Sequence, residues 1–212
     1  MVDLKLGDCL SEMSLMSSGS IPCVITDIPY NKVNRPTGGL RQIDKGGADS
    51  TPVDIEQVVT ELVRITSGSI YVWCATEQVS VLRESLIQVG MTTRVCVWHK
   101  SNPSPMNGQH LWLSGLELCV FARKKGAIFN RFCANPIWKG PSERVKGFSC
   151  PKPVWLMIEL IEASSNVGDT ILDPFMGSGS TGVACIKTGR KFVGIEIDPV
   201  TFALAQDRLK GD

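Results

Sequence analysis

The sequence has few of the features that mark metal-binding, secreted or membrane-spanning proteins. Its 8 cysteines never lie closer together than 14 positions, and its only histidines are His99 and His110. Because structural zinc sites use closely spaced cysteine and histidine pairs, no metal is expected. No apolar run approaches the ~18 residues of a membrane helix, and no basic-then-apolar leader opens the chain. We therefore expect a soluble, unsecreted, cytoplasmic protein with reduced cysteines.

The chain as a whole also lacks an excess of either charge. It has 22 Lys and Arg against 21 Asp and Glu, a net charge of +1 that argues against nucleic-acid binding. The average conceals a strong local imbalance. Residues 123–152 contain eight basic residues and only one acid, Glu143, so they carry +7 and the rest of the chain carries −6. Residues 32–45 add a second basic segment of +3.

Aromatic residues are interleaved with the bases of the larger segment, at Phe129, Phe132, Trp138 and Phe148. Basic and aromatic side chains together suit phosphate neutralisation and base stacking. A solvated loop with a few packing aromatics is the alternative. The candidate DNA-binding residues are Lys32, Arg35, Arg41, Lys124, Lys125, Arg131, Lys139, Arg144 and Lys146.

Alternating strand and helix patterns predict the fold class. Strands are expected at 2–6, 22–26, 69–74, 92–98, 116–121, 170–172 and 191–196, and helices at 53–66, 76–89, 153–165, 179–188 and 199–209. This alternation is typical of a doubly wound α/β fold with a mostly parallel sheet, whereas 92–98 and 116–121 read as an antiparallel hairpin. We expect a single domain, 1–212, with long functional loops at 31–52 and 123–150.

The most specific pattern is a strand that runs into a glycine-rich turn, TILDPFMGSGS at 170–180. Glycines let a ligand approach the backbone, and an acid ending the next strand is typical of ribose binding. An acid before the turn would repel a pyrophosphate, and no lysine follows the glycines as in a nucleoside-triphosphate loop. The acid suits the ammonium and sulfonium of S-adenosylmethionine. The candidate ligand-binding residues here are Asp173, Phe175, Gly177, Gly179, Ser180 and Glu196.

A second pattern ends an apolar strand near the amino end, with Asp27-Ile28-Pro29-Tyr30. A carboxylate and turn carbonyls can accept the hydrogens of a planar amine while an aromatic ring stacks on its heterocycle. Taken alone, the four residues could equally be an ordinary turn at the end of a strand.

Together the two patterns resemble the amino-methyltransferases that methylate exocyclic nitrogens of adenine or cytosine in DNA. The catalytic tetrad of that family, Asp/Asn/Ser-Pro-Pro-aromatic, corresponds to 27–30, and its cofactor turn to 173–179. The tetrad precedes the cofactor turn, a circularly permuted motif order that matches the β group. Further segments resemble the family in order, at 7–10, 97–100, 117–121 and 150–157.

The resemblance implies a Rossmann-like methyltransferase fold, S-adenosyl-L-methionine as cofactor and DNA as substrate. It implies that the target base is flipped out, that Tyr30 stacks on it, and that Asp27 and the carbonyl of Ile28 hold its amine. It also implies cofactor contacts for Asp8, Cys9, Asp27 and Lys152. Two positions depart from the family pattern: Ile28 replaces the first proline, and Cys150-Pro151 replaces the usual Thr-Gln.

The family trend links an aspartate tetrad with N6-adenine, so adenine is favoured over N4-cytosine. The alternatives are a methyltransferase of RNA or glutamine side chains, and an inactive relative that binds cofactor and DNA. The resemblance further implies a bacterial or phage-encoded restriction-modification or solitary methylase and a homodimer. The short interval at 123–150 predicts a short or relaxed recognition sequence.

Overall fold

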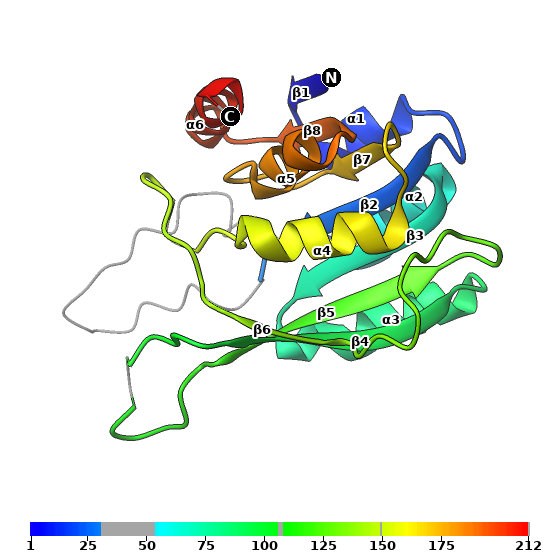
Figure 1. The fold of residues 1–212 in the computed structure, drawn as a ribbon. Coiled ribbons are helices and arrows are strands. Elements are labelled where there is room, and N and C mark those ends of the chain that lie inside the picture. Colours follow the sequence, from blue (N-terminus) through cyan, green and yellow to red (C-terminus); the bar gives the residue numbers. More distant parts are fainter. Residues whose placement is uncertain (31–53, 106–107, 149, 212) are drawn as a thin grey trace.

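In the described residues, one eight-stranded sheet carries helices on both faces (Figure 1). The computed structural model describes residues 1–30, 54–105, 108–148 and 150–211. The strand order is β1-β8-β7-β2-β3-β5-β4-β6, and β5 runs antiparallel to both of its neighbours while every other pair is parallel. The strands are β1 (Val2–Leu6), β2 (Ile21–Asp27), β3 (Thr66–Cys74), β4 (Thr92–Lys100), β5 (Leu116–Arg123), β6 (Ile137–Gly140), β7 (Thr170–Asp173) and β8 (Lys191–Glu196).

The helices divide between the two faces of the sheet, and each group covers its own apolar core. One face carries α1 (Cys9–Ser14), α2 (Ile55–Ile65) and α3 (Val79–Gln88), with the short 3₁₀ helix η2 (Thr76–Gln78) leading into α3. The other carries α4 (Val154–Ser164), α5 (Ser180–Thr188) and α6 (Pro199–Gly211). In the described part of the chain, no helix combines the length and the hydrophobicity that crossing a membrane requires.

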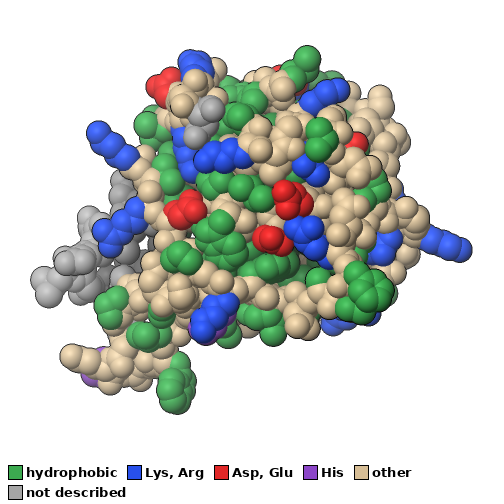
Figure 2. All heavy atoms as spheres, viewed as in Figure 1, with side chains coloured by type: hydrophobic (Ala, Val, Ile, Leu, Met, Phe, Trp, Pro, Cys, Tyr) green, Lys and Arg blue, Asp and Glu red, His purple; other side chains and the backbone are tan. Residues whose placement is uncertain are grey.

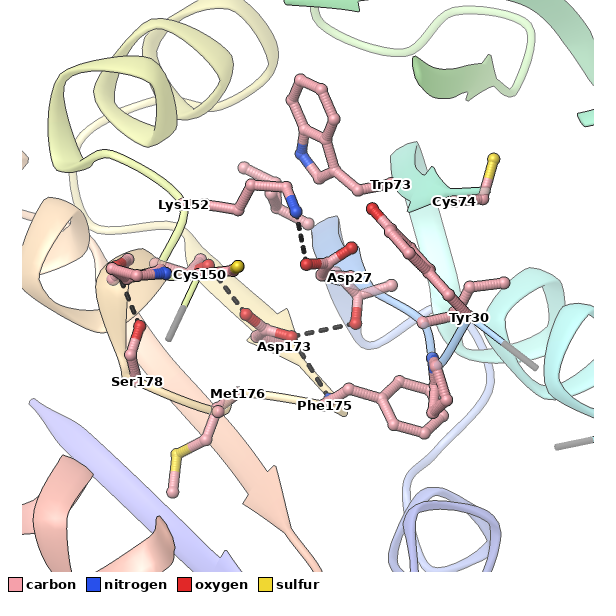
Figure 3. Close-up of a pocket in the computed structure, with 18 of the residues that line it drawn as sticks. Asp27, Tyr30, Trp73, Cys74, Cys150, Lys152, Asp173, Phe175, Met176 and Ser178 are labelled. Carbon is pink, nitrogen blue, oxygen red and sulfur yellow. Dashed lines mark hydrogen bonds and ion pairs between the residues drawn. The ribbon is translucent and has the colours of Figure 1, made fainter. Parts of the chain in front are cut away.

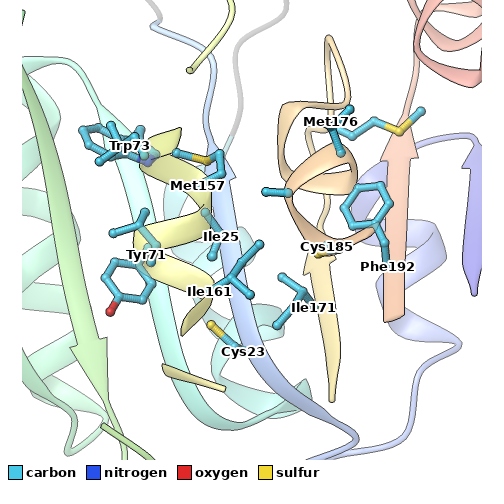
Figure 4. Close-up of a cluster of buried hydrophobic side chains, with 14 of the residues drawn as sticks. Cys23, Ile25, Tyr71, Trp73, Met157, Ile161, Ile171, Met176, Cys185 and Phe192 are labelled. Atoms are coloured by element: carbon cyan, nitrogen blue, oxygen red, sulfur yellow. The ribbon is translucent and has the colours of Figure 1, made fainter. Parts of the chain in front are cut away.

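The central strands are buried on both sides because their residues alternate between the two cores. Along β3, Tyr71 and Trp73 enter the core beneath α4, whereas Ile70 and Val72 enter the opposite core. Successive side chains of a strand point to opposite faces, so a strand covered by helices on both sides must be apolar throughout. Figure 4 shows the first of these cores, with Met157 of α4 facing the strands.

The predicted fold class is confirmed, and the elements that sequence periodicity missed are the short ones. β6 has four residues, lies within the interval 123–150 and is held by parallel pairing with β4 rather than by its own pattern. α1 has six residues, too few for a helical repeat to show; it begins where the Asp8 side chain accepts a hydrogen bond from the Ser11 N–H. The predicted loop 31–52 lies outside the described residues.

The direction of chain winding changes between β2 and β7, and this places the site. From β2 the chain passes through α2 to β3 on one side, and from β7 it passes through α5 to β8 on the other. Open α/β sheets bind ligands in the crevice that such a reversal leaves at the carboxyl ends of the strands. Both predicted motifs follow these two strands directly.

Gly182 tests how closely α5 packs on the sheet. A Cβ at this position would lie 2.8 Å from atoms of Leu209 and Phe192. We expect Gly182→Ala to lower the free energy of unfolding by about 1–3 kcal/mol in urea denaturation, although alanine is the better helix former. Gly211→Ala is the control, because a Cβ added there would meet no atom of another part of the structure within 4 Å. It should change the free energy of unfolding little. Equal stability of Gly182→Ala and wild type would contradict the close packing.

Candidate active site

A cavity of ≈ 850 Å³ opens at the carboxyl ends of β2, β3, β7 and β8, and both sequence motifs line it. Twelve of the predicted catalytic and cofactor residues contribute to its wall; Gly179 does not, and instead precedes α5 in a left-handed conformation. The twelve are Asp8, Cys9, Asp27, Ile28, Pro29, Tyr30, Lys152, Asp173, Phe175, Gly177, Ser180 and Glu196. Asp8 and Glu196, 188 positions apart in the sequence, therefore share one site.

Asp173 joins β2, β7 and α5 at the floor of this cavity. Its Oδ1 accepts hydrogen bonds from Thr26 Oγ1 at 2.9 Å and from the Phe175 N–H at 3.2 Å, and its Oδ2 accepts one from Thr181 Oγ1 at 2.7 Å (Figure 3). Burial raises the pKa of the carboxyl to about 7, against the opposing effect of the hydrogen bonds from Thr181 and Thr26. Oδ2 has one donor and can accept another.

Glu196 closes the glycine turn from the end of β8. Its Oε2 accepts the Gly177 N–H at 3.1 Å and its Oε1 accepts the Asp198 N–H at 2.9 Å. Burial raises the pKa of the Glu196 carboxyl, and these backbone donors partly offset it. Because each oxygen uses one lone pair, both can still accept a ligand hydroxyl.

Lys152 lies against Asp27 of the predicted catalytic tetrad, a contact that was not expected from the sequence. Its ammonium forms an ion pair with Asp27 Oδ2, and lies 3.0 Å from Glu117 Oε2. Glu117 Oε1 is paired in turn with Lys100 Nζ at 2.5 Å. The expected contact of Lys152 with the cofactor stays a prediction, whereas its contact with Asp27 is part of the structure.

Four buried polar atoms of the cavity wall form no hydrogen bond among the described residues: Asp27 Oδ1, Tyr30 Oη, Trp73 Nε1 and Glu117 Oε2. The last of these still lies 3.0 Å from the Lys152 ammonium. Figure 3 shows the Tyr30 ring beside Asp27, with Trp73 on the next strand. The Lys152 ammonium lies 5.8 Å from the Tyr30 ring centroid and 5.6 Å from the Trp73 ring centroid. Since buried polar atoms are normally paired, unpaired ones in a cavity wall indicate a polar ligand.

The turn that carries the tetrad is held from β3 and η2. The N–H of Ile28 donates to the Trp73 carbonyl at 3.1 Å, and the Ile28 side chain is buried. Gln78 Nε2 donates to the Pro29 carbonyl at 3.0 Å. These contacts fix the turn without the first proline of the family pattern, because the strand and η2 supply the constraint.

Sequence reasoning missed Glu117, Lys100, Gln78 and Trp73, which all line the cavity or support its wall. A signal existed for Glu117, a carboxylate at the start of the otherwise apolar segment Leu-Cys-Val-Phe of β5. A charge in an apolar strand indicates a paired or functional group. Gln78 gave no such signal, because its role depends on a tertiary contact.

The basic side chains of the predicted insertion at 123–150 do not lie together on one surface. Because β5 is antiparallel to β3, its carboxyl end lies at the end of the sheet opposite the cavity. There the side chain of Lys124 donates to the Val63 carbonyl. Arg131 pairs with Glu159 and Glu162 on α4. Figure 2 accordingly shows basic and acidic side chains dispersed over this face.

Other members of the insertion return to the cavity side. β6 runs parallel to β4, so Lys139 lies beside His99 and the chain then leads through Arg144 and Lys146 to cavity-lining Gly147 and Phe148. The side chains of these three bases are exposed. Lys125 follows Lys124 at the far end, while Lys32, Arg35 and Arg41 lie outside the described residues. In the described ranges, no group of three or more potential metal ligands is arranged around one point.

The doubly wound sheet, its reversed β5 and the cavity at the reversal point define a methyltransferase-type fold. Residues 122–207 match the family model described as DNA methylase. The chain is 24% identical to the type II methyltransferase M2.DpnII of Streptococcus pneumoniae, with 97% of the chain and 88% of the relative covered. It is 26% identical to M2.LlaDCHI of Lactococcus lactis subsp. cremoris, covering 90% and 82%.

Solved structures agree with the sequence matches. The complex of M1.HpyAVI with SAM superposes with a TM-score of 0.76 at 23% identity, covering 99% of this chain and 100% of that one. The cytosine-N4-specific PvuII DNA methyltransferase superposes with a TM-score of 0.73 at 15% identity, covering 98% and 86%. The resemblance to DNA amino-methyltransferases inferred from the sequence motifs is confirmed by these matches.

The raised pKa of Asp173 predicts a specific pH dependence. The pKa of the Asp173 carboxyl is 3.8 in the unfolded chain and about 7 in the folded protein. Between these two pH values the folded state therefore binds more protons than the unfolded chain does. The stabilising contribution of Asp173 is therefore fully present below pH 3.8, and it is lost as the pH rises through about 7. We expect the free energy of unfolding of wild type, minus that of Asp173→Asn, to decrease from about pH 4 to about pH 7 in urea denaturation.

Asp207→Asn is the matched control, because this carboxylate is 78% exposed on α6. Its difference from wild type should stay nearly constant over the same interval. A pH-independent difference for Asp173→Asn would show that this carboxyl titrates normally.

Proposed function

We propose that the protein is an S-adenosylmethionine-dependent DNA methyltransferase that methylates the exocyclic N6 of a flipped adenine. The observation that carries the proposal is the buried Asp27 carboxylate next to Tyr30, in one cavity with the glycine turn after β7; no donor among the described residues reaches Oδ1 with hydrogen-bond geometry. The type II methyltransferases among its relatives and the SAM complex of M1.HpyAVI support the same activity.

The cavity offers acceptors that fit the proposed cofactor. Glu196 has a free lone pair on each oxygen for ribose hydroxyls, and Asp173 Oδ2 has one for the ammonium group. Asp8 and Cys9 line the same wall at the start of α1 and are assigned to the adenine end. When bound, the cofactor supplies a methyl group on an electrophilic sulfonium.

The tetrad provides what an incoming amine needs. Asp27 Oδ1 and the carbonyl of Ile28 accept the two amine hydrogens, and Tyr30 stacks on the base. Holding both hydrogens points the nitrogen lone pair toward the methyl group, and the Asp27 carboxylate stabilises the positive charge that develops on nitrogen. Catalysis then rests on positioning and electrostatics, without a protein nucleophile.

The choice of adenine rests on Asp27 as the first tetrad residue. The fold does not decide between the two amines, since the cytosine-N4-specific PvuII enzyme superposes about as well as M1.HpyAVI does. N4-cytosine is therefore the second candidate, and the methylated base identifies which one is correct.

DNA is assigned to the cavity mouth, where Lys139, Arg144 and Lys146 are exposed along β6 and the segment that follows it. Phosphates bind such dispersed lysines and arginines without sequence preference, so specificity requires base contacts. The segment is short, and the recognition sequence is proposed to be short as well.

The activity is tested by transfer of a tritiated methyl group from S-adenosylmethionine to DNA. We expect wild type to label DNA and Asp27→Ala to lower kcat by at least about 10²-fold, because alanine offers no acceptor for the amine hydrogens and no negative charge for the nitrogen. Mass spectrometry of the hydrolysed product should show N6-methyladenine. RNA and protein run in parallel as acceptors, and exclusive labelling of either one would refute the proposal.

The role of Glu196 is tested by calorimetry. Glu196→Ala should weaken S-adenosylmethionine binding by about 1–3 kcal/mol, because ribose hydroxyls and the Gly177 N–H lose their acceptor. Asp198→Ala is the control from the same turn, since its carboxylate caps α6 through the Thr201 N–H and does not line the cavity. Unchanged affinity for Glu196→Ala would rule out the assigned contact.

A further inference from the structure

Four charged side chains form a continuous row along the cavity wall that ends at the first residue of the tetrad. They alternate in sign, from Lys100 on β4 to Glu117 on β5, then Lys152 before α4, and then Asp27 at the end of β2. Lys152 is the most enclosed, with 10% of its side chain exposed, and Glu117 follows at 18%. The row is neutral overall, so its members can be buried together.

Lys152 occupies the middle of this row and is shared by two carboxylates. It contacts Oδ2 of Asp27 and lies 3.0 Å from Oε2 of Glu117. Glu117 Oε1 pairs with Lys100, whereas Asp27 Oδ1 has no hydrogen-bond partner among the described residues. Glu117 Oε2 is not hydrogen-bonded either, but it lies within ion-pair distance of Lys152. Of the two carboxylates, Glu117 is therefore the better compensated.

An amine that binds Asp27 must share this carboxylate with Lys152. Withdrawing a buried ammonium from its only carboxylate would leave an uncompensated charge and be strongly destabilising. Glu117 removes most of that cost, because it already lies within contact distance on the other side of Lys152. A small shift of the ammonium then exchanges one carboxylate for the other without leaving a charge unpaired.

We propose that Glu117 is a positioning residue for the transfer reaction, which receives Lys152 from Asp27 when the amine of the target base binds. The inference deepens the proposed function and rests on it. Glu117 touches neither the base nor the methyl group; it acts through Lys152 and determines how fully Asp27 is available as an acceptor.

The pKa values are consistent with this sharing. Burial raises the pKa of Asp27, and Lys152 opposes that rise. Burial acts in the same direction on Glu117, yet Lys152 and Lys100 hold its pKa below the usual range. The other titratable groups facing Asp27 are Tyr30, Cys74 of β3, Cys119 of β5 and Asp173 of β7.

The first test measures Asp27 itself by ¹³C NMR titration of aspartate-labelled protein, with Asp27→Asn identifying its carboxyl signal. In Glu117→Gln the pH at the titration midpoint of the Asp27 carboxyl should be lower than in wild type. Lys152 then has Asp27 as its only carboxylate, and the negative charge of Glu117 is gone. In Lys152→Met it should rise. An unchanged midpoint in Glu117→Gln would refute the sharing of Lys152, whatever the enzyme's activity.

The second test is single-turnover methyl transfer to DNA as a function of pH. Glu117→Gln should slow transfer roughly tenfold and shift its pH profile, with S-adenosylmethionine affinity unchanged. Glu117→Asp, which keeps the charge, should recover part of the rate and of the profile. Glu159→Gln is the matched control, because it removes a half-exposed carboxylate that pairs with Arg131 on the outer side of α4.

The outcomes separate the two proposals. A wild-type protein that methylates no DNA contradicts the proposed function, while the NMR titration still decides whether Lys152 is shared. An active wild type with a Glu117→Gln variant of equal rate and profile contradicts the positioning role alone. A slower variant with an unshifted profile and no recovery in Glu117→Asp also overturns it, since that pattern marks a structural defect.

Discussion

The carboxylate of Asp173 connects the parts of the molecule on which its site depends. Through Thr26 and Thr181 it links the ends of two neighbouring strands, β2 and β7, to the first turn of α5. These strands mark the point where the winding of the sheet reverses. Because burial disfavours its charge, the group is retained at a cost to stability that its hydrogen bonds only partly offset. Buried carboxyl groups with raised pKa values are found more often at functional sites than elsewhere in proteins.

Most of the sheet and both motifs could be predicted from the sequence, because they rest on local signals. Apolar runs ending in Asp27 and Asp173 indicated strands with an acid at their carboxyl ends, and the glycine-rich turn could be read directly from the sequence. Register and pairing were not available from these patterns. β6 is recognisable only through its partner β4, and the proximity of Lys152 to Asp27 depends on the packing of α4 against the sheet.

The basic segment shows the limit of arguments from charge density along a chain. Its residues are close in sequence, but they lie on both ends of the sheet, and Arg131 is neutralised by acids of α4. The reason is the antiparallel course of β5, followed by the return of the chain along β6. The bases that remain near the cavity are those after this return, so three-dimensional position, rather than net charge, separates them from the others.

The reversed direction of β5 also determines which connections could carry inserted residues near the cavity. The connection from β4 to β5 emerges at the cavity, where Ser114 and Leu116 belong to the wall, whereas the connection that leaves Arg123 emerges at the opposite end of the sheet. Surface connections tolerate insertions well. Residues added to the first connection would extend the wall of the cavity, and residues added to the second would enlarge the molecule without reaching the cavity. One reversed strand thus separates the part of the chain open to new specificity from the part that is free to vary in size.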